Sequence, residues 1–199
     1  MGLHVHGQGS STGAAALFSV IRSGDGDKLE QLLNAGANPN DTMDGYSPLM
    51  AAALNGTAEA MKILIRYGAD INYINPDSLT ALWLAIPDEE KTMLLLDKGA
   101  DAHIIARGGM TMLNKLVSIP GTAPLIQLFI TKGTDVKKNN DGNSLIVRTV
   151  ISGDTAVLGM LIRLGLDINE ADPAGVPPII YAAQYHSLST LAMLVEQGA

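Results

Sequence analysis

The sequence contains no cysteine and few aromatic residues, and each shortage excludes a class of protein. Without cysteine there can be no disulfides, thiol nucleophiles, iron–sulfur clusters or thiolate zinc sites. Aromatic residues make up only 4% of the 199 residues, so a buried core must be built from aliphatic side chains. Because hydrophobic residues still account for 47% and charged residues for 17%, we expect a folded chain rather than a disordered one.

Positive charge is also scarce, and this bears on the partners that the chain can bind. Thirteen basic residues face 20 acidic ones, giving a formal net charge of −7 without a basic cluster. Binding to nucleic acid or to an anionic membrane surface depends on such clusters. No apolar run approaches the roughly 20 residues that cross a bilayer. We therefore expect neither nucleic acid nor a membrane as partner, and a neutral or basic protein surface fits the charge better.

Signals for targeting and catalysis are missing as well. Residues 1–13 lack the basic and apolar regions of a signal peptide and are predicted to form a flexible leader. Cytoplasmic localisation is therefore the default expectation, with a secreted effector as the alternative. No phosphate-binding loop, dinucleotide fingerprint, HExxH motif or GxSxG motif is present, so we expect no catalytic residues, no metal and no cofactor.

What the sequence does contain is a repeat. A short motif made of glycine, a small residue and a polar or acidic residue recurs six times at intervals of 31 to 34 residues. Each glycine follows an apolar stretch with helical spacing, where glycine fits the left-handed position that ends a helix. These glycines are Gly36, Gly68, Gly99, Gly133, Gly165 and Gly198.

A second, shorter helix is predicted upstream of each of these stretches, so that every repeat holds a pair of helices. Ser47 before Pro48 illustrates the start signal, since serine caps a helix well and proline suits its first turn. One such pair cannot bury its apolar face alone, whereas stacked pairs can. The predicted helices are 15–23 and 27–34, 48–54 and 58–66, 81–86 and 89–97, 112–118 and 123–131, 145–152 and 155–163, and 178–185 and 188–196.

These residues resemble the ankyrin repeat family. Residues 44–56 read DGYSPLMAAALNG and residues 68–72 read GADIN, which is similar to the family pattern DGxTPLHxAAxxG followed by GADVN. Residues 141–145 and 165–169 match it more loosely. The resemblance implies an all-α solenoid of six helix–turn–helix units joined by short β-turn loops. The units would cover about 14–41, 42–73, 74–104, 105–138, 139–170 and 171–199.

The resemblance also implies a function. Ankyrin arrays typically bind other proteins, so we expect a monomeric, non-enzymatic scaffold that holds a partner protein on its concave face. The alternative is the targeting module of a longer effector or enzyme whose active domain lies outside this chain. The alternative is motivated by the last helix, which ends near Ala199 and lacks the polar outer face of a terminal repeat.

The chain departs from the family pattern in two ways. The histidine of the TPLH motif steadies the loop, but its position is never histidine here, so the loops must be held by other means. Pro87 and Pro120 fall where the third unit is short and the fourth is long, and each predicts an abrupt helix end. The residues at the histidine position are Phe18, Met50, Trp83, Asn114, Val147 and Ile180.

Candidate partner-binding residues follow from positions that the family often uses for contacts. Trp83, the single tryptophan, is either an interface anchor or a packing residue between adjacent repeats, and the sequence does not decide between the two. Together the candidates would form a partly apolar groove, of a kind that tends to bind proteins. They are Tyr46, Met50, Leu54, Asn55, Leu79, Trp83, Met110, Asn143, Val176 and Tyr185.

Overall fold

The computed structural model describes residues 10–137, 144–185 and 187–199, which form two compact units, Met1–Asp101 and Ala102–Ala199. Every regular element in these residues is an α-helix, and Met43 and Tyr46 form an isolated β-bridge. Unit 1 contains α1 (Ser10–Ser23), α2 (Gly26–Asn34), α3 (Pro48–Asn55), α4 (Ala58–Arg66), α5 (Ala81–Ala85) and α6 (Glu89–Asp97). Unit 2 contains α7 (Met112–Val117), α8 (Ala123–Thr131), α9 (Leu145–Ser152), α10 (Thr155–Arg163), α11 (Pro178–Gln184) and α12 (Leu188–Glu196).

The paired helices predicted from the sequence are confirmed. Apart from α1, every helix begins and ends within one residue of its predicted bounds. The exception is the first helix, which starts at Ser10 instead of residue 15, so residues 10–13 of the expected leader are helical. Residues 1–9 of that leader lie outside the described residues.

The repeated glycines end the second helix of each pair as predicted. Their φ angles lie between +78° and +97°, a region that residues with a β-carbon rarely adopt. The residue after each glycine donates its N–H to a carbonyl five positions earlier, as Ala69 does to Leu64 and Thr134 does to Phe129. This is the Schellman pattern, which satisfies carbonyls at the helix end that would otherwise lack a donor.

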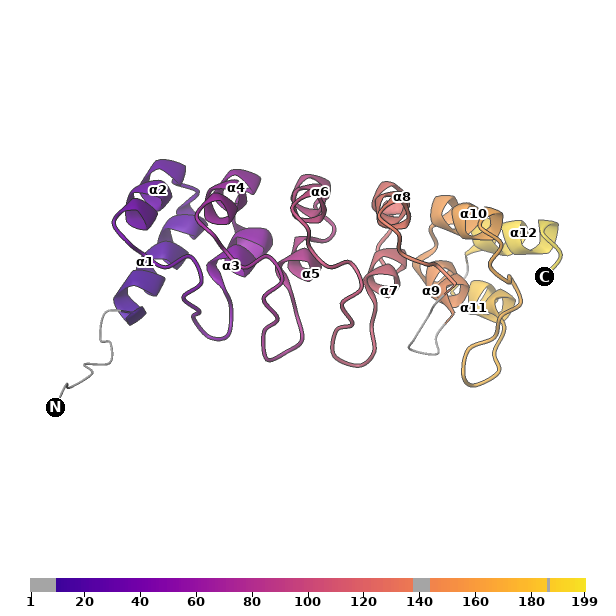
Figure 1. Cartoon of the computed structure of the whole chain (residues 1–199). Helices are drawn as coiled ribbons and strands as arrows, with labels where there is room; N and C mark the ends of the chain where they lie inside the picture. The colour runs from indigo at the N-terminus through magenta and orange to yellow at the C-terminus, as the bar shows by residue number, and fades with distance from the viewer. Residues whose placement is uncertain (1–9, 138–143, 186) are drawn as a thin grey trace. The chain divides into compact units, whose positions relative to one another are not determined.

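Each unit stacks three helix pairs in two layers. In unit 1, α1, α3 and α5 pack in sequence as one layer, and α2, α4 and α6 form the second (Figure 1). In unit 2, α7, α9 and α11 form the first layer, and α8, α10 and α12 the second. Fully buried aliphatic side chains such as Leu49, Leu64, Leu116 and Leu161 lie between the layers. None of the described helices is both long enough and apolar enough to cross a membrane.

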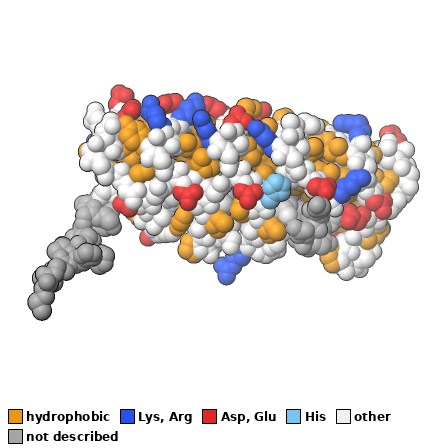
Figure 2. All heavy atoms as spheres, in the orientation of Figure 1, with side chains coloured by type: hydrophobic (Ala, Val, Ile, Leu, Met, Phe, Trp, Pro, Cys, Tyr) orange, Lys and Arg blue, Asp and Glu red, His pale blue; other side chains and the backbone are white. Residues whose placement is uncertain are grey.

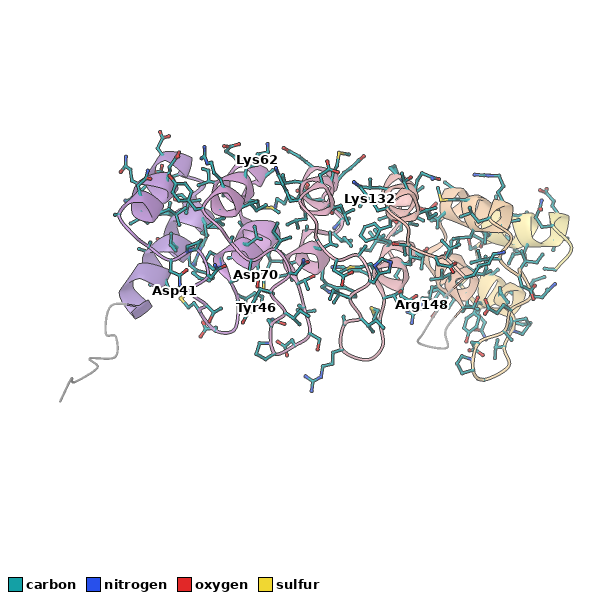
Figure 3. All side chains as sticks on the ribbon, in the orientation of Figure 1. Asp41, Tyr46, Lys62, Asp70, Lys132 and Arg148 are labelled. Atoms are coloured by element: carbon teal, nitrogen blue, oxygen red, sulfur yellow. The ribbon has the colours of Figure 1, made fainter. Side chains whose placement is uncertain are left out.

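Asparagine side chains fasten successive repeats of unit 1 to one another. The amide of Asn40 donates to the carbonyl of Gly68 (3.0 Å) and accepts from the N–H of Asp70 (2.7 Å), and Asp70 is labelled in Figure 3. Asn72 repeats this with Gly99 (3.2 Å) and Asp101 (2.9 Å). We call this two-bond arrangement the asparagine clasp. It uses both ends of one carboxamide to hold the turn of the next repeat.

Other polar side chains hold the loops that lack the family's histidine. The side-chain oxygen of Asn75 accepts N–H bonds from Asp77 and Leu79 in unit 1. Asp172 does the same for Ala174 and Val176 in unit 2. In each loop one side-chain oxygen thus accepts from the amides two and four residues further along the chain, and the first of these bonds forms an Asx-turn.

The two irregular repeats end their first helices near proline, as predicted. α5 stops at Ala85, and the Ile86–Pro87 peptide bond that follows is cis. In the fourth repeat, α7 stops at Val117, and the long turn is held by the buried hydroxyl of Thr122. This hydroxyl donates toward the carbonyls of Leu116 (2.7 Å) and Ile119 (2.9 Å).

Replacing Asn72 by alanine tests the clasp. The variant loses both bonds to Gly99 and Asp101. Because net hydrogen bonds contribute about 0.5–1.5 kcal/mol each, and these are exposed, we expect a loss of about 1 kcal/mol in the free energy of unfolding, measured by urea denaturation. Asn55→Ala, at an exposed position without a clasp, serves as control and should change stability by less than about 0.5 kcal/mol. Equal effects of the two substitutions would contradict a role for the clasp.

Candidate functional site

The first helices of the pairs and the loops before them form one side of each unit, which we call the first-helix face. In unit 1, Tyr46 lies on this side and Lys62 on the opposite side, where the second helices run (Figure 3). In unit 2, Arg148 and Lys132 are divided in the same way (Figure 3). The first-helix face is the side on which the sequence predicts partner contacts.

A hollow of about 170 Å³ opens between α1 and α3 on the first-helix face of unit 1. Phe18 and Ile21 supply its apolar wall, and Arg22 and Asn55 add polar groups. Leu54, next to Asn55, leaves 47% of its surface exposed. An exposed leucine beside a small hollow that contains an arginine is a contact surface suited to another protein.

A second hollow, of about 250 Å³, opens between α7 and α9 in unit 2. It is lined by Arg148 and Ile151 together with Ser118 and Ser152. Ile151 is 39% exposed. Both units therefore combine an arginine, an apolar side chain and small polar groups in a hollow between consecutive first helices.

The predicted contact residues occupy different environments. Four of them are partly exposed and directly precede the N-cap residue of a first helix: Tyr46, Leu79, Met110 and Val176. Trp83, on α5, is partly exposed as well, so both of its predicted roles stay open. The most exposed candidates stand near the ends of first helices: Leu54, Asn55 and Tyr185, the last 57% exposed.

Met50 and Asn143 differ from the other candidates. Met50 is fully buried, with 0% of its surface exposed, so the prediction that it contacts a partner is wrong. It lies in the first turn of α3, where its side chain enters the core rather than the solvent. Asn143 lies outside the described residues.

Sequence reasoning missed several residues of the face. Lys115, Arg148 and Tyr181 each directly follow a residue at the position that the family fills with histidine. All three are partly exposed on consecutive first helices of unit 2. Their signal in the sequence is the repeat register, since each occupies the position directly after the family's histidine position.

Tyr181 and Asp172 form a polar pair at the base of the last described loop. The Tyr181 hydroxyl donates to Asp172 Oδ2, and this bond lowers the pKa of the Asp172 carboxyl, with help from the Val176 N–H. The same bond raises the pKa of Tyr181 above its ordinary value. The pair therefore fixes the loop to α11 while keeping the carboxylate ionised.

Lys115 is the most strongly perturbed cation among the described residues. Burial lowers its pKa to about 8, because a partly desolvated ammonium is less stable than one in water. The first-helix face of unit 2 therefore carries a partly buried cation. This face carries local positive charge, although the net charge of the whole chain is −7.

The opposite side carries ordinary surface charge pairs. Acidic and basic side chains alternate along the second helices of unit 1, at the upper edge in Figure 2. Lys62 lies 3.8 Å from Glu59 and 3.5 Å from Glu90, and Arg66 lies 3.2 Å from Glu30. All of these side chains are well exposed, so the pairs contribute little to stability.

Replacing Lys115 by methionine should stabilise the protein. The folded pKa of Lys115 is about 8, below its unfolded value, so the unfolding free energy of the natural protein should rise between pH 8 and about 10.5. Methionine removes the buried charge, adding on the order of 1 kcal/mol at pH 7 and flattening that rise. Urea denaturation across this pH range measures both effects. Lys98→Met, at an exposed site, is the control, and an unchanged pH slope in Lys115→Met would contradict the assignment.

Replacing Tyr181 by phenylalanine should raise the pKa of Asp172 toward its ordinary value. Because the Asp172 pKa is lowered in the folded protein, its stabilising contribution is present above about pH 3.9 and is lost as the pH falls through the folded value. Carboxyl carbon NMR follows this titration directly. Tyr185→Phe should leave the Asp172 pKa in place. The same Asp172 pKa in Tyr181→Phe and the natural protein would show that the bond is unimportant.

Comparisons with known proteins agree with this geometry. A family model described as ankyrin repeats (3 copies) matches residues 16–106. The chain is 27% identical over 202 residues to human transient receptor potential cation channel subfamily A member 1, covering 94% of this chain and 18% of the channel protein. It is 32% identical over 127 residues to the putative ankyrin repeat protein FPV240 of fowlpox virus (strain NVSL), covering 62% of this chain and 31% of that protein. The chain thus spans less than a third of the length of either relative.

The fold has a solved counterpart. The crystal structure of the human ASB11 ankyrin repeat domain superposes with a TM-score of 0.78 at 19% sequence identity, covering 92% of this chain and 83% of that one. This likeness establishes the predicted all-α repeat fold. Ankyrin repeats are generally modules for protein–protein interaction, and the fold is typically non-catalytic. The sequence pattern, the stacked helix pairs and both comparisons identify the chain as an ankyrin repeat protein.

Proposed function

We propose that this chain is a scaffold that binds a partner protein on its first-helix face, without catalysing a reaction. The observation that supports this most is the pair of hollows between consecutive first helices, each containing an arginine and apolar side chains. Arginine and aromatic residues dominate the energetics of many protein interfaces, and Tyr185 adds a largely exposed ring to the face of unit 2.

The charges of the face indicate what the partner should offer. Arg22 lines the hollow of unit 1, and Lys115 and Arg148 lie on the face of unit 2. Partner carboxylates or carbonyls would make favourable contacts with these side chains, and apolar partner side chains would cover Leu54 and Ile151. The net charge of −7 would still favour partners with basic surroundings during diffusional approach.

Affinity capture from a lysate of the source cells tests this proposal. The Leu54→Ala, Tyr185→Ala double variant removes two exposed contacts and should retain the partner at least about 10-fold less strongly than the natural chain. Met93→Ala is a matched control, because Met93 is 42% exposed on α6, a second helix. Circular dichroism verifies that all three proteins fold. Equal retention by the double variant and the natural chain would overturn binding on the first-helix face.

A second candidate function is that of a targeting module within a longer effector or enzyme. The specific support is that both relatives are much longer than this chain, which spans 18% of one and 31% of the other. Sequencing the transcript past the codon for Ala199 tests it. A continuing reading frame that encodes a further domain would support this role, and a stop codon directly after Ala199 would remove it.

A further inference from the structure

Unit 2 has a pocket at the position where unit 1 has an asparagine clasp. Asn40, Asn72 and His103 each stand four residues after a helix-ending glycine. The two asparagines clasp the turn of the next repeat, but the third position carries an exposed imidazole. A pocket of about 200 Å³ lies beside His103, and the turn formed by Gly133, Thr134 and Asp135 lines its other side.

The turn in this pocket presents the same backbone groups that unit 1 uses to hold a carboxamide. The Gly68 and Gly99 carbonyls accept from an amide nitrogen, and the Asp70 and Asp101 N–H groups donate to its oxygen. The corresponding groups in unit 2 are the Gly133 carbonyl and the Asp135 N–H. Neither makes a hydrogen bond to any residue in the described part of the chain.

The side chains around this turn add to the polar character of the pocket. The Thr134 hydroxyl oxygen is buried and has no hydrogen-bond partner among the described residues. Leaving such a buried hydroxyl without a hydrogen bond costs free energy, so a polar group of a ligand that reached it would be stabilised. Ile105 and Met112 line the pocket as well, which suits the short aliphatic stem of a side chain.

Imidazole cannot take the place of the amide in this arrangement. A primary carboxamide carries a donor nitrogen and an acceptor oxygen on one carbon, as a clasp requires. The two ring nitrogens of a histidine point in diverging directions and cannot serve adjacent backbone groups of one turn together. The change from asparagine to histidine therefore leaves the turn ready for an amide from outside the chain.

A neighbouring junction in unit 2 shows why the pocket at His103 is the better candidate. Lys137 stands at the asparagine position of the next repeat, and a pocket of about 200 Å³ lies there too. A β-carbon placed on Gly165 would lie 3.7 Å from Lys137 Nζ, so an ammonium donor already sits beside that turn. The residues that line the pocket at His103 include no lysine or arginine.

We propose that this pocket, lined by His103, Gly133, Thr134 and Asp135, binds a primary carboxamide, presented as an Asn or Gln side chain by a partner protein. The amide oxygen accepts from the Asp135 N–H, and its nitrogen donates to the Gly133 carbonyl. The volume fits one side chain and is below the roughly 300–1,000 Å³ of typical small-molecule sites. This proposal rests on the proposed function in one respect: a partner protein must present the amide.

A small probe tests the pocket without any partner. The probe is Nα-acetyl-asparagine N-methylamide, added to the full ¹⁵N-labelled chain, with the NMR shifts of the Thr134 and Asp135 amides as readout. We expect saturable shifts with a Kd on the order of 1–10 mM, as suits a ligand of this size. The corresponding aspartate and leucine probes have the same shape without the amide, and should bind at least about 10-fold more weakly. No saturable shift, or equal binding of the leucine probe, would overturn the proposal.

Two substitutions at one position make the test specific. His103→Asn supplies the missing amide from within the chain, so it should abolish probe binding and raise the melting temperature by about 2–4 °C. His103→Ala removes the imidazole without supplying an amide, so it should still bind the probe. Probe binding that survives in His103→Asn, or that is lost in His103→Ala while the fold is intact, would contradict the proposal.

The outcome is separable from that of the proposed function. The Leu54→Ala, Tyr185→Ala variant leaves the residues of this pocket unchanged, so it should bind the probe as the natural chain does. Failure of the probe with intact capture of a partner would refute only the carboxamide pocket. Probe binding without partner capture would refute only the first-helix face.

Discussion

No helix pair in this chain can bury its apolar face alone, and the rest of the structure depends on that constraint. Each pair contributes one wall of a core whose other wall belongs to the next pair, as the full burial of Leu49, Leu64 and Leu116 shows. The turns between repeats must therefore hold a fixed register. Unit 1 achieves this by the asparagine clasp, in which one carboxamide satisfies a carbonyl and an N–H of the next turn.

This constraint also separates the two sides of each unit. The second helices expose alternating charges that form weak surface pairs. Hollows remain between consecutive first helices, and side chains such as Arg148 and Ile151 line the hollow of unit 2. Stacking of the helix pairs thus leaves a surface on which equivalent positions recur from repeat to repeat. The proposed binding function relies on this surface.

Most of the architecture could be predicted from the sequence, because it depends on interactions between residues that are close together in the chain. Glycine at a helix end and serine or threonine before a first helix act within a few residues, so the helices were placed nearly to the residue. Burial was harder to predict: Met50 sits at a family contact position but enters the core, since its direction depends on packing against the neighbouring pair. The boundary after Asp101 has no local sequence signal, and neither does the pocket at His103, whose turn is 30 residues further along the chain.

Amide hydrogen exchange on the natural chain tests the central claim most directly, namely that one kind of turn is closed by an asparagine in unit 1 and open in unit 2. The Asp70 and Asp101 N–H groups are bonded to clasp oxygens, whereas Asp135 lines the pocket beside His103 and its N–H has no such bond among the described residues. The account predicts protection factors at least about 10-fold higher for Asp70 and Asp101 than for Asp135. Protection of Asp135 equal to that of the other two would show that its turn is already closed from within the chain, and would contradict the account.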